Sequence, residues 1–306
     1  MACTGAVVRG CRGEPRSSFG AVVVALLLLM ADHRADATER AGRSFLWRVR
    51  SETTTVHILG SIHLMKPEAY PLGGAIEDAF ANAEAVMFEV DLDQLTGAAL
   101  KLLAAGSLPR GQRLRHVLPA ETWGLAESRL VDLGMDVEGV QSMRPWLLAV
   151  SITSAELARA GYDQTAGIDL HFFDRAKRSG KRRLALESID FQVELFADLS
   201  REEDADFLRY TLDELDTLIP MVDELVEHWQ SGHVAEVESL LTEAYREFPD
   251  LFRRLVSDRN RNWLPQIEDL LAGHEPAMVV VGALHLVGEQ GLVEQLRRRG
   301  FLVEQQ

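Results

Sequence analysis

Hydrophobic and polar positions follow two different periods in the first regular part of the chain. Residues 44–50 and 54–60 alternate apolar, often β-branched, and polar side chains around a polar turn at residues 51–53, which predicts a hairpin. Residues 72–83 place apolar side chains at helical spacing. Residues 84–90 are a compact apolar run that is typical of a buried strand. The predicted order is therefore hairpin, helix, strand.

The C-terminal part of the chain repeats this order. Residues 277–281 predict a buried strand, residues 289–299 a helix, and residues 301–304 a further strand. Another strand is predicted at residues 183–186, after a helix at residues 169–179. These patterns predict an α/β fold with a central mixed sheet, built from two βαβ-like units.

Long helical patterns separate the two units. The further predicted helices cover residues 121–134, 145–160, 202–229, 233–247 and 251–272. Because residues 190–272 contain no pattern typical of a strand, we predict a large helical insertion there. Its apolar spacing fits a lid, a dimer surface or ordinary packing. No low-complexity linker divides the chain, which predicts a single domain over residues 44–306.

The N-terminal residues have the layout of a secretory signal peptide. Basic residues up to Arg16 precede an uncharged apolar stretch at residues 19–30, and Ala35–Ala37 fits a cleavage site. We therefore predict a signal peptide over about residues 1–37 and export to the periplasm or the outside of the cell. A permanent anchor is the less favoured alternative, because a spanning helix needs about 20 apolar residues.

Removal of this segment changes the composition in two ways. It contains four of the 32 basic and three of the 47 acidic residues, so the net charge goes from −15 to −16. Such a charge argues against nucleic acid as a partner. The segment also contains both cysteines, Cys3 and Cys11. The remaining chain then has no disulfide, no thiolate metal site and no cysteine nucleophile.

Two short motifs carry the main functional signal. Gly60–Leu64 (GSIHL) follows the apolar run at residues 56–59, and Gly282–Leu286 (GALHL) follows the run at residues 278–281. A buried strand that ends in Gly-x-x-His brings a side chain to the carboxyl edge of an α/β sheet, where such sheets bind ligands. We therefore expect the histidines of the two motifs to converge on one site.

Carboxylates lie close to these motifs in the predicted sheet. Glu89 and Asp91 are two positions apart at the end of one strand, so they are expected on the same side. With His63 and His285, Glu89 would form a catalytic shell for manganese, cobalt, zinc or iron rather than calcium. Such an ion would activate a bound water, and Glu187 could act as the general base.

Structural explanations compete with these roles. Each histidine could simply bond a loop, and Glu89 could belong to a structural salt bridge. Asp169 is placed to serve as the N-cap of a helix. The polar cluster at residues 258–262 is typical of a solvated helix face. The sequence contains no HExxH, GxSxG, Walker or GxGxxG motif, so serine hydrolases and nucleotide enzymes have no support.

Taken together, the motifs resemble the TraB/GumN family, which includes the Tiki metalloproteases that inactivate Wnt ligands. The segments that carry the resemblance are GSIHLMKPEAYPL, AVMFEVDL, MRPWLLAV, GIDLHFFDRAKRSGKRRLALES, DRNRNWLPQIEDLL and VVVGALHLVGEQGLVEQLRRRGF. They run from about residue 44 to 304 and are most similar to the bacterial, secreted GumN-like branch. The resemblance implies a fold related to erythromycin esterases and to the haem-uptake ChaN proteins.

The resemblance also implies roles for individual residues. His63, His285 and Glu89 fall on the metal-site positions, and the Arg-Asn block falls on Arg259 and Asn260, which would stabilise an oxyanion. Three further candidates would support the site. Glu187 and Asp169 lie in blocks that recur in the family, and Asp169 and Asp91 would lie behind the metal ligands.

Three functional hypotheses follow from these residues. The first is a secreted or periplasmic divalent-metal-dependent hydrolase, most simply a peptidase. The second is a non-catalytic protein that binds a peptide, or haem or iron, in the same cleft. The third is a small-molecule esterase, by analogy with the erythromycin esterases. The metal and the substrate are not determined by the sequence.

Overall fold

Six strands form one mixed sheet in the computed structural model, in the order β4-β3-β5-β2-β1-β6. The structure describes residues 43–246 and 248–306, so the predicted signal peptide lies outside the described residues. The strands are β1 (Leu46–Arg50), β2 (Thr55–Ser61), β3 (Ala85–Phe88), β4 (Arg182–Ala185), β5 (Ala277–Gly282) and β6 (Leu302–Gln305). Each lies within two residues of its predicted position, and the α/β prediction is confirmed.

The four strands β4, β3, β5 and β2 are neighbours and parallel, whereas β1 is antiparallel to both β2 and β6. The chain passes from β2 through α1 (Gly74–Asn82) to β3, and β5 lies between those two strands. The two βαβ-like units of the sequence are therefore interleaved in space. As a result, the carboxyl ends of four parallel strands meet at one edge of the sheet.

The side chains of the strands explain this order. Every residue of β3 (AVMF) and β5 (AMVVVG) is buried, which is expected for central parallel strands that are covered on both faces. The residues of β4 (RRLA) are exposed or partly exposed, and this strand lies at the edge of the sheet. Charged residues on an edge strand discourage pairing with another chain.

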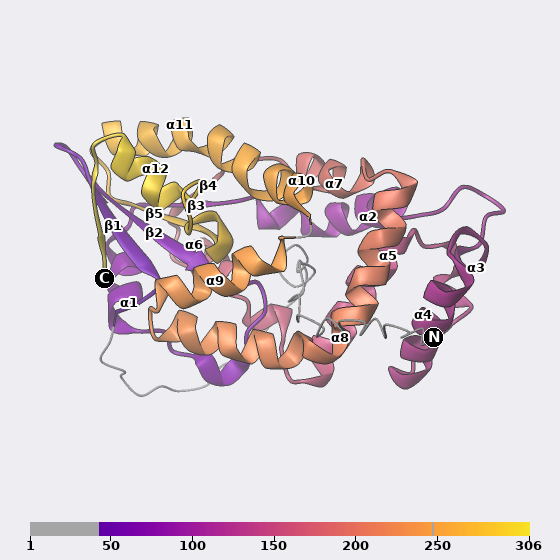
Figure 1. The fold of residues 1–306 in the computed structure, drawn as a ribbon. Coiled ribbons are helices and arrows are strands. Elements are labelled where there is room, and N and C mark those ends of the chain that lie inside the picture. The colour runs from indigo at the N-terminus through magenta and orange to yellow at the C-terminus, as the bar shows by residue number, and fades with distance from the viewer. Residues whose placement is uncertain (1–42, 247) are drawn as a thin grey trace, which may run out of the picture.

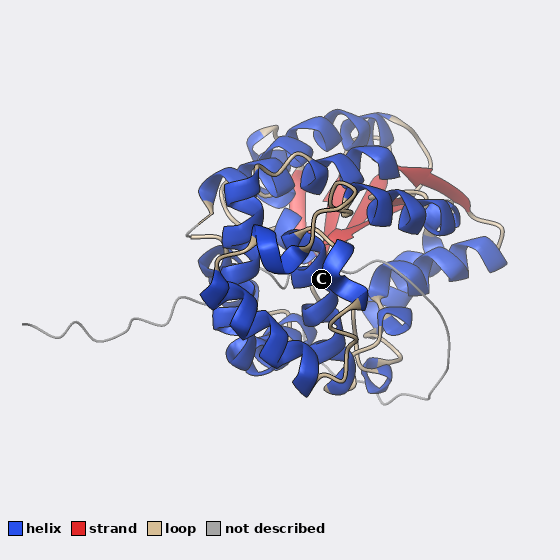
Figure 2. Cartoon of the chain, turned by 90° about the vertical axis from the view of Figure 1, so that its right-hand side faces the viewer, coloured by secondary structure: helices blue, strands red, loops and turns tan. Residues whose placement is uncertain are grey.

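Helices make up most of the rest of the molecule (Figures 1 and 2). They are α1, α2 (Leu95–Ala105), α3 (Leu114–Val117), α4 (Ala120–Asp132), α5 (Pro145–Arg159), α6 (Ile168–Arg178), α7 (Ile189–Ala197), α8 (Arg201–Gln230), α9 (Val234–Ala244), α10 (Pro249–Phe252), α11 (Asp258–Ala272) and α12 (Leu292–Arg298). A π-helical turn, Arg253–Ser257, joins α10 to α11.

The helical part of the molecule is larger than the predicted insertion at residues 190–272. Three helices between β3 and β4 pack against the insertion: α5 and α4 contact α8, and α2 contacts α7. Figure 1 shows these two segments side by side beyond the sheet. Helix α2 was not predicted, because its residues (LTGAALKLLAA) are apolar nearly throughout and show little contrast between an apolar and a polar face.

A buried hydrogen bond ties the end of α8 to the sheet. The indole Nε1 of Trp229 donates to the carbonyl oxygen of Gly60 over 2.6 Å, at the end of β2. Gly60 has no room for a side chain, because an added Cβ would overlap the ring of Phe45. At the other end of α8, Ser200 and Glu203 form a capping box. The Trp229 bond thus joins the end of α8 to the first Gly-x-x-His turn.

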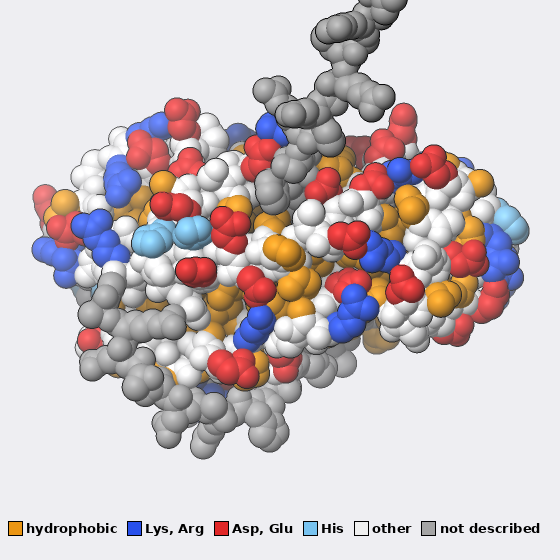
Figure 3. All heavy atoms as spheres, turned by 60° about the horizontal axis from the view of Figure 1, so that its bottom comes forward, with side chains coloured by type: hydrophobic (Ala, Val, Ile, Leu, Met, Phe, Trp, Pro, Cys, Tyr) orange, Lys and Arg blue, Asp and Glu red, His pale blue; other side chains and the backbone are white. Residues whose placement is uncertain are grey.

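The surface mixes charges of both signs. Figure 3 shows Lys, Arg, Asp and Glu side chains dispersed over one face, with hydrophobic side chains between them near its centre. Within the part of the chain that the structure describes, no helix has the length and apolar character needed to cross a membrane.

Candidate functional site

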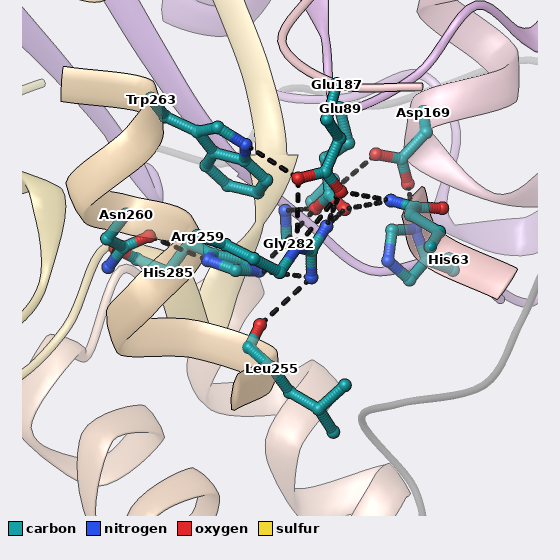
Figure 4. Close-up of polar contacts among 12 residues, drawn as sticks. His63, Glu89, Asp169, Glu187, Leu255, Arg259, Asn260, Trp263, Gly282 and His285 are labelled. Atoms are coloured by element: carbon teal, nitrogen blue, oxygen red, sulfur yellow. Dashed lines mark hydrogen bonds and ion pairs between the residues drawn. The ribbon is translucent and has the colours of Figure 1, made fainter. Parts of the chain in front are cut away.

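Four consecutive strands of the sheet each deliver a polar side chain to the same edge. Going across the sheet, Glu187 follows β4, Glu89 follows β3, His285 follows β5 and His63 follows β2. The paired ladders of β3 and β4 continue past their ends, because the N–H of Glu187 donates to the carbonyl of Glu89 over 2.9 Å. Figure 4 shows these side chains pointing toward one another. The convergence of these side chains, which the sequence predicted, is therefore found at this edge of the sheet.

His63 is held by a carboxylate. Its Nδ1 lies 2.5 Å from Oδ2 of Asp169, and the hydroxyl of Ser61 donates to Oδ1 of the same carboxylate over 2.7 Å. Asp169 lies in the first turn of α6, whose start is fixed by a bond from the N–H of Ile168 to the carbonyl of Ile62. Gly167 precedes it because a Cβ there would strike the carbonyl of His63.

This contact controls the protonation of His63. Burial lowers the pKa of the ring, but the charge and hydrogen bond of Asp169, together with the charge of Glu89, raise it to about 9. The Nε2 atom has no hydrogen-bond partner among the described residues and points toward Glu89 and Gly282. His63 thus presents one ring nitrogen to the site, while the other is fixed by the carboxylate.

Glu89 is a buried carboxylate at the centre of the edge. Its Oε1 accepts the N–H of Gly282 over 2.8 Å, and its Oε2 accepts Nη2 of Arg259 over 2.5 Å. Burial alone would raise its pKa, but the charges of Arg259 and of His63, with the Gly282 bond, hold the pKa well below its usual range. Glu89 therefore stays ionised.

Arg259 of α11 uses every N–H donor of its guanidinium inside the protein. Nε and Nη2 donate to Glu187, Nη2 also donates to Glu89, and Nη1 donates to the carbonyl of Leu255 and to Nε2 of His285. The ring of Trp263 lies 4.6 Å below its Cζ. Since no donor is left over, an oxyanion role for Arg259 would require one of these bonds to break.

The carboxylate oxygens of Glu187 are likewise occupied by hydrogen bonds. Besides Arg259, its oxygens accept Nε2 of Gln192 over 2.9 Å and the indole Nε1 of Trp263 over 2.9 Å. A general base needs a free lone pair toward the water that it deprotonates. In this arrangement Glu187 holds Arg259 in place, and the general-base role stays a prediction without a geometric basis.

His285 is held by an amide instead of a carboxylate. Its Nδ1 lies 2.7 Å from Oδ1 of Asn260, and the Asn260 amide donates to the carbonyls of His285 and Gln290. Burial lowers the pKa of His285, and the charge of Arg259 lowers it further, to about 3. The ring is therefore neutral, donates from Nδ1 and accepts the Arg259 proton at Nε2. Asn260, like Arg259, has no free donor.

The predicted metal ligands surround a space beside Gly282. A Cβ added to Gly282 would lie 3.3 Å from Oε1 of Glu89, 3.6 Å from Cδ2 of His285 and 3.7 Å from Nε2 of His63. His285 Nε2 is 3.9 Å from Oε1 of Glu89 but already accepts from Arg259. Among the described residues no group of three His, Cys, Asp or Glu side chains converges closely enough to hold an ion.

Of the predicted ligands, His63 and Glu89 turn a ring nitrogen and a carboxylate oxygen toward this space, and their role as metal ligands stays a prediction. His285 could join them only if Arg259 released its Nε2. Nitrogen and carboxylate oxygen donors suit manganese, iron, cobalt or zinc.

Two predictions about neighbouring aspartates were wrong. The strand ends at Phe88, so Glu89 and Asp91 do not share it; Asp91 instead accepts from the N–H of Asp93 and the amide of Gln94, away from the site. The backbone bends at residues 89–90, and a short 3-10 turn (Leu92–Gln94) follows Asp91. Asp169 is not an N-cap, since Gly167 takes that position. Its side chain serves His63.

Three residues of the site were not singled out from the sequence: Ser61, Gln192 and Trp263. Trp263 follows Arg259 by four positions, so the helical repeat places both on one face of α11 and could have indicated the contact. Ser61 lies two positions before His63. Gln192 has no such spacing signal, because a change of direction into α7 separates it from Glu187.

A cavity of about 250 Å³ opens beside these polar residues. The side chains of His63, Glu89, Arg259 and His285, with Gly282, form one end of its lining. Much of the remaining wall comes from helices that precede and follow β4 in the chain. The cavity therefore borders the polar residues at the sheet edge.

Comparisons with known proteins bear on this site. A model of the TraB/PrgY/gumN family matches residues 45–305. The chain is 22% identical over 241 residues to the uncharacterized protein YbaP of Escherichia coli (strain K12), covering 79% of this chain and 87% of that protein. It is 24% identical over 315 residues to metalloprotease TIKI1 of Danio rerio, covering 85% and 63%.

A third relative is an uncharacterized protein of Treponema pallidum (strain Nichols), 22% identical over 273 residues, covering 84% of this chain and 81% of that protein. No solved structure matches the chain. The expected likeness to erythromycin esterases and ChaN proteins therefore stays a prediction.

Proposed function

The chain belongs to the TraB/PrgY/gumN family, and from that premise we propose that it is a divalent-metal-dependent hydrolase that cleaves peptides. The observation that carries the proposal is the convergence of His63 Nε2 and Glu89 Oε1 on the space beside Gly282, at the polar end of a cavity. The similarity to a protein named metalloprotease TIKI1 supports the choice of reaction.

We assign a separate role to each residue of the site. His63 and Glu89 would hold the ion, and Asp169 would fix the ring of His63 so that Nε2 faces it. When bound, the ion would lower the pKa of a coordinated water and polarise the scissile carbonyl. Glu89 keeps its charge because Arg259 and the Gly282 N–H stabilise the carboxylate.

Arg259 and His285 would act as a support layer behind the ligands. Arg259 links Glu89, Glu187 and His285, so it fixes the position of the Glu89 carboxylate relative to the sheet edge. Asn260 fixes the tautomer of His285, whose Nε2 must accept from Arg259. This assignment differs from the oxyanion role expected for Arg259 and Asn260, and it follows from their filled hydrogen bonds.

One observation favours a second candidate, a small-molecule esterase that uses no metal. The contact of Asp169 with His63 leaves Nε2 facing the cavity, which is the geometry of an oriented histidine acid or base. In this case His63 would move a proton at Nε2 and Glu89 would only shape the site. The two candidates differ in their response to a chelator.

Both candidates can be tested with one panel of labelled peptides and aryl esters. Each substrate is offered to the protein after chelator treatment and after reloading with manganese, cobalt, zinc or iron. The first candidate predicts peptide cleavage that returns only with an ion, and its loss in His63→Ala and Glu89→Gln. His274→Ala removes an exposed histidine and should behave as wild type.

Two results would contradict one or both of these candidate functions. Ester cleavage that is unchanged in chelator but lost in His63→Ala would replace the first candidate by the second. Full peptidase activity in a folded His63→Ala protein would contradict both.

A further inference from the structure

The cavity at the sheet edge has two chemically different ends. The polar end consists of the strand-end residues already described. The other end is formed by helices that precede and follow β4 in the chain, so it exists only because the two helical segments pack together. Helices α2, α8 and α9 contribute only aliphatic side chains to it: Ala98, Ala99, Leu102, Val222, Leu225 and Leu241. We refer to this end as the apolar chamber.

The remaining walls of the chamber are also largely apolar. Helix α5 contributes Trp146, Val150 and Leu157, together with the hydroxyl of Ser154. These positions recur every three or four residues, so one stripe of α5 borders the cavity, while the helix also packs against α8. An empty space lined by such side chains costs stability, because their atoms lose the contacts they would have in a packed core. The chamber is therefore shaped for an occupant.

Backbone chemistry limits what that occupant can be. The walls are the sides of helices, whose N–H and C=O groups are bonded within the helix. A peptide backbone placed there would leave its amides without partners, which is costly in an apolar environment. An alkyl chain or an apolar side chain has no such groups and can enter.

A second hollow suggests where the rest of a substrate lies. It has a volume of about 600 Å³ and shares Leu64, Ser154 and Gln164 with the cavity. Its other walls include the polar residues Tyr162 and Asp163. A chain entering from this side can leave its polar part outside, place its carbonyl group near His63, and extend its apolar part into the chamber.

We propose that the apolar chamber binds a single hydrophobic group, an acyl chain or an apolar side chain, attached next to the carbonyl that is cleaved. The chamber thus determines the substrate class: acyl derivatives, or peptides with one large apolar residue at the cleaved bond. The position of the carbonyl rests on the proposed hydrolase function, whereas binding of the hydrophobic group does not.

The test is a chain-length series measured on the chelator-treated protein, where no turnover interferes. Straight-chain fatty acids from butanoate to dodecanoate are titrated by calorimetry. Burial of each added methylene should tighten binding about fourfold until the chamber is full, after which affinity should level off. A second series of N-acetyl amino-acid amides compares leucine, phenylalanine and serine side chains and separates the two kinds of hydrophobic group.

Neighbouring leucines of α2 supply a matched pair of variants. Leu102 lines the chamber, whereas Leu103 is 50% exposed on the outer side of the same helix. Leu102→Trp should weaken binding of the longest acids tenfold or more and shift the plateau to shorter chains, and Leu103→Trp should leave the series unchanged. Leu102→Ala should extend the plateau to longer acids, which guards against loss of binding through misfolding.

Two results would overturn the chamber proposal: equal affinity for butanoate and dodecanoate, or the same series for both tryptophan variants. These results are separate from failure of the hydrolase proposal. A chain-length dependence without any cleavage would leave the chamber and remove the hydrolase. Cleavage without chain-length dependence would do the reverse.

Discussion

The two Gly-x-x-His turns share a sequence pattern but hold their histidines in opposite environments. At the first turn, Nδ1 of His63 meets the carboxylate of Asp169, and the side chain is 24% exposed. At the second, Nδ1 of His285 meets the amide of Asn260, and the side chain is 6% exposed beside a charged arginine. The pKa is raised to about 9 in one ring and lowered to about 3 in the other.

This difference separates a histidine that faces the cavity from one that supports it. A motif repeated in the sequence does not make the two copies chemically equal, because the residue behind Nδ1 comes from a different helix in each case. Nε2 of His63 faces the cavity, whereas Nε2 of His285 accepts a hydrogen bond from Arg259.

The largest effect is expected from Arg259→Met, which removes the support behind His285. Glu89 and Glu187 would then be buried carboxylates without their cation, so the free energy of unfolding should fall by about 3–5 kcal/mol in urea. Arg261→Met removes a cation that is 70% exposed on the same helix and should cost less than about 0.5 kcal/mol. Equal effects of the two variants would show that the buried network contributes nothing.

The next largest effect is expected from Asp169→Asn, measured as a function of pH in chelator. The pKa of His63 is higher in the folded state than its unfolded value of 6.5. The protonated ring therefore contributes fully to the free energy of unfolding below pH 6.5, and this contribution is lost as the pH rises through 9. The free energy of unfolding of wild type should exceed that of the variant by about 3 kcal/mol at pH 6, and this difference should disappear toward pH 10. A gap that stays constant with pH would contradict this account of His63.

Asn260→Asp makes the partner of His285 a carboxylate, as at the first turn. The amide donors to the carbonyls of His285 and Gln290 would become acceptors, so three oxygens would face one another in a buried site. We expect a loss of about 2 kcal/mol in the free energy of unfolding. Asn262→Asp, on an exposed position of α11, is the control. A neutral effect of Asn260→Asp would mean that the two turns are interchangeable.

The smallest effect on stability is expected from Gly282→Ala, which fills the space between the turns. The new methyl would lie 3.3 Å from Glu89 Oε1 and should cost less than about 1 kcal/mol, while binding of manganese or zinc should weaken tenfold or more. Gly74→Ala, where the methyl meets open space, should change neither quantity. Unchanged ion binding in Gly282→Ala would place any metal elsewhere.

The sequence predicted the sheet edge and most of its polar residues. The strands and the Gly-x-x-His turns could be found because buried parallel strands are continuous apolar runs that end in glycine. His63 and His285 follow runs of this kind, whereas Glu89 follows the apolar strand β3 and Glu187 follows the edge strand β4. The four residues meet at one edge because these strands pair in parallel.

The hydrogen-bond partners of these residues could not be predicted in the same way. That Arg259 satisfies two carboxylates and one imidazole at once depends on how α11 lies across the sheet, which no local pattern encodes. The apolar chamber was hidden for a related reason. Val150 and Leu225 have the spacing of ordinary core residues, and only packing decides that they face a cavity.

The most direct test of the account is the metal content of the purified protein after reloading and exhaustive dialysis, measured by elemental mass spectrometry. Wild type and His274→Ala should retain close to one equivalent of manganese, cobalt, zinc or iron. His63→Ala and Glu89→Gln should retain none, because these residues face the space beside Gly282. His285→Ala should retain part of it, since His285 accepts from Arg259 instead. Full metal content in a folded His63→Ala protein would contradict the assignment of His63 as the cavity-facing ligand.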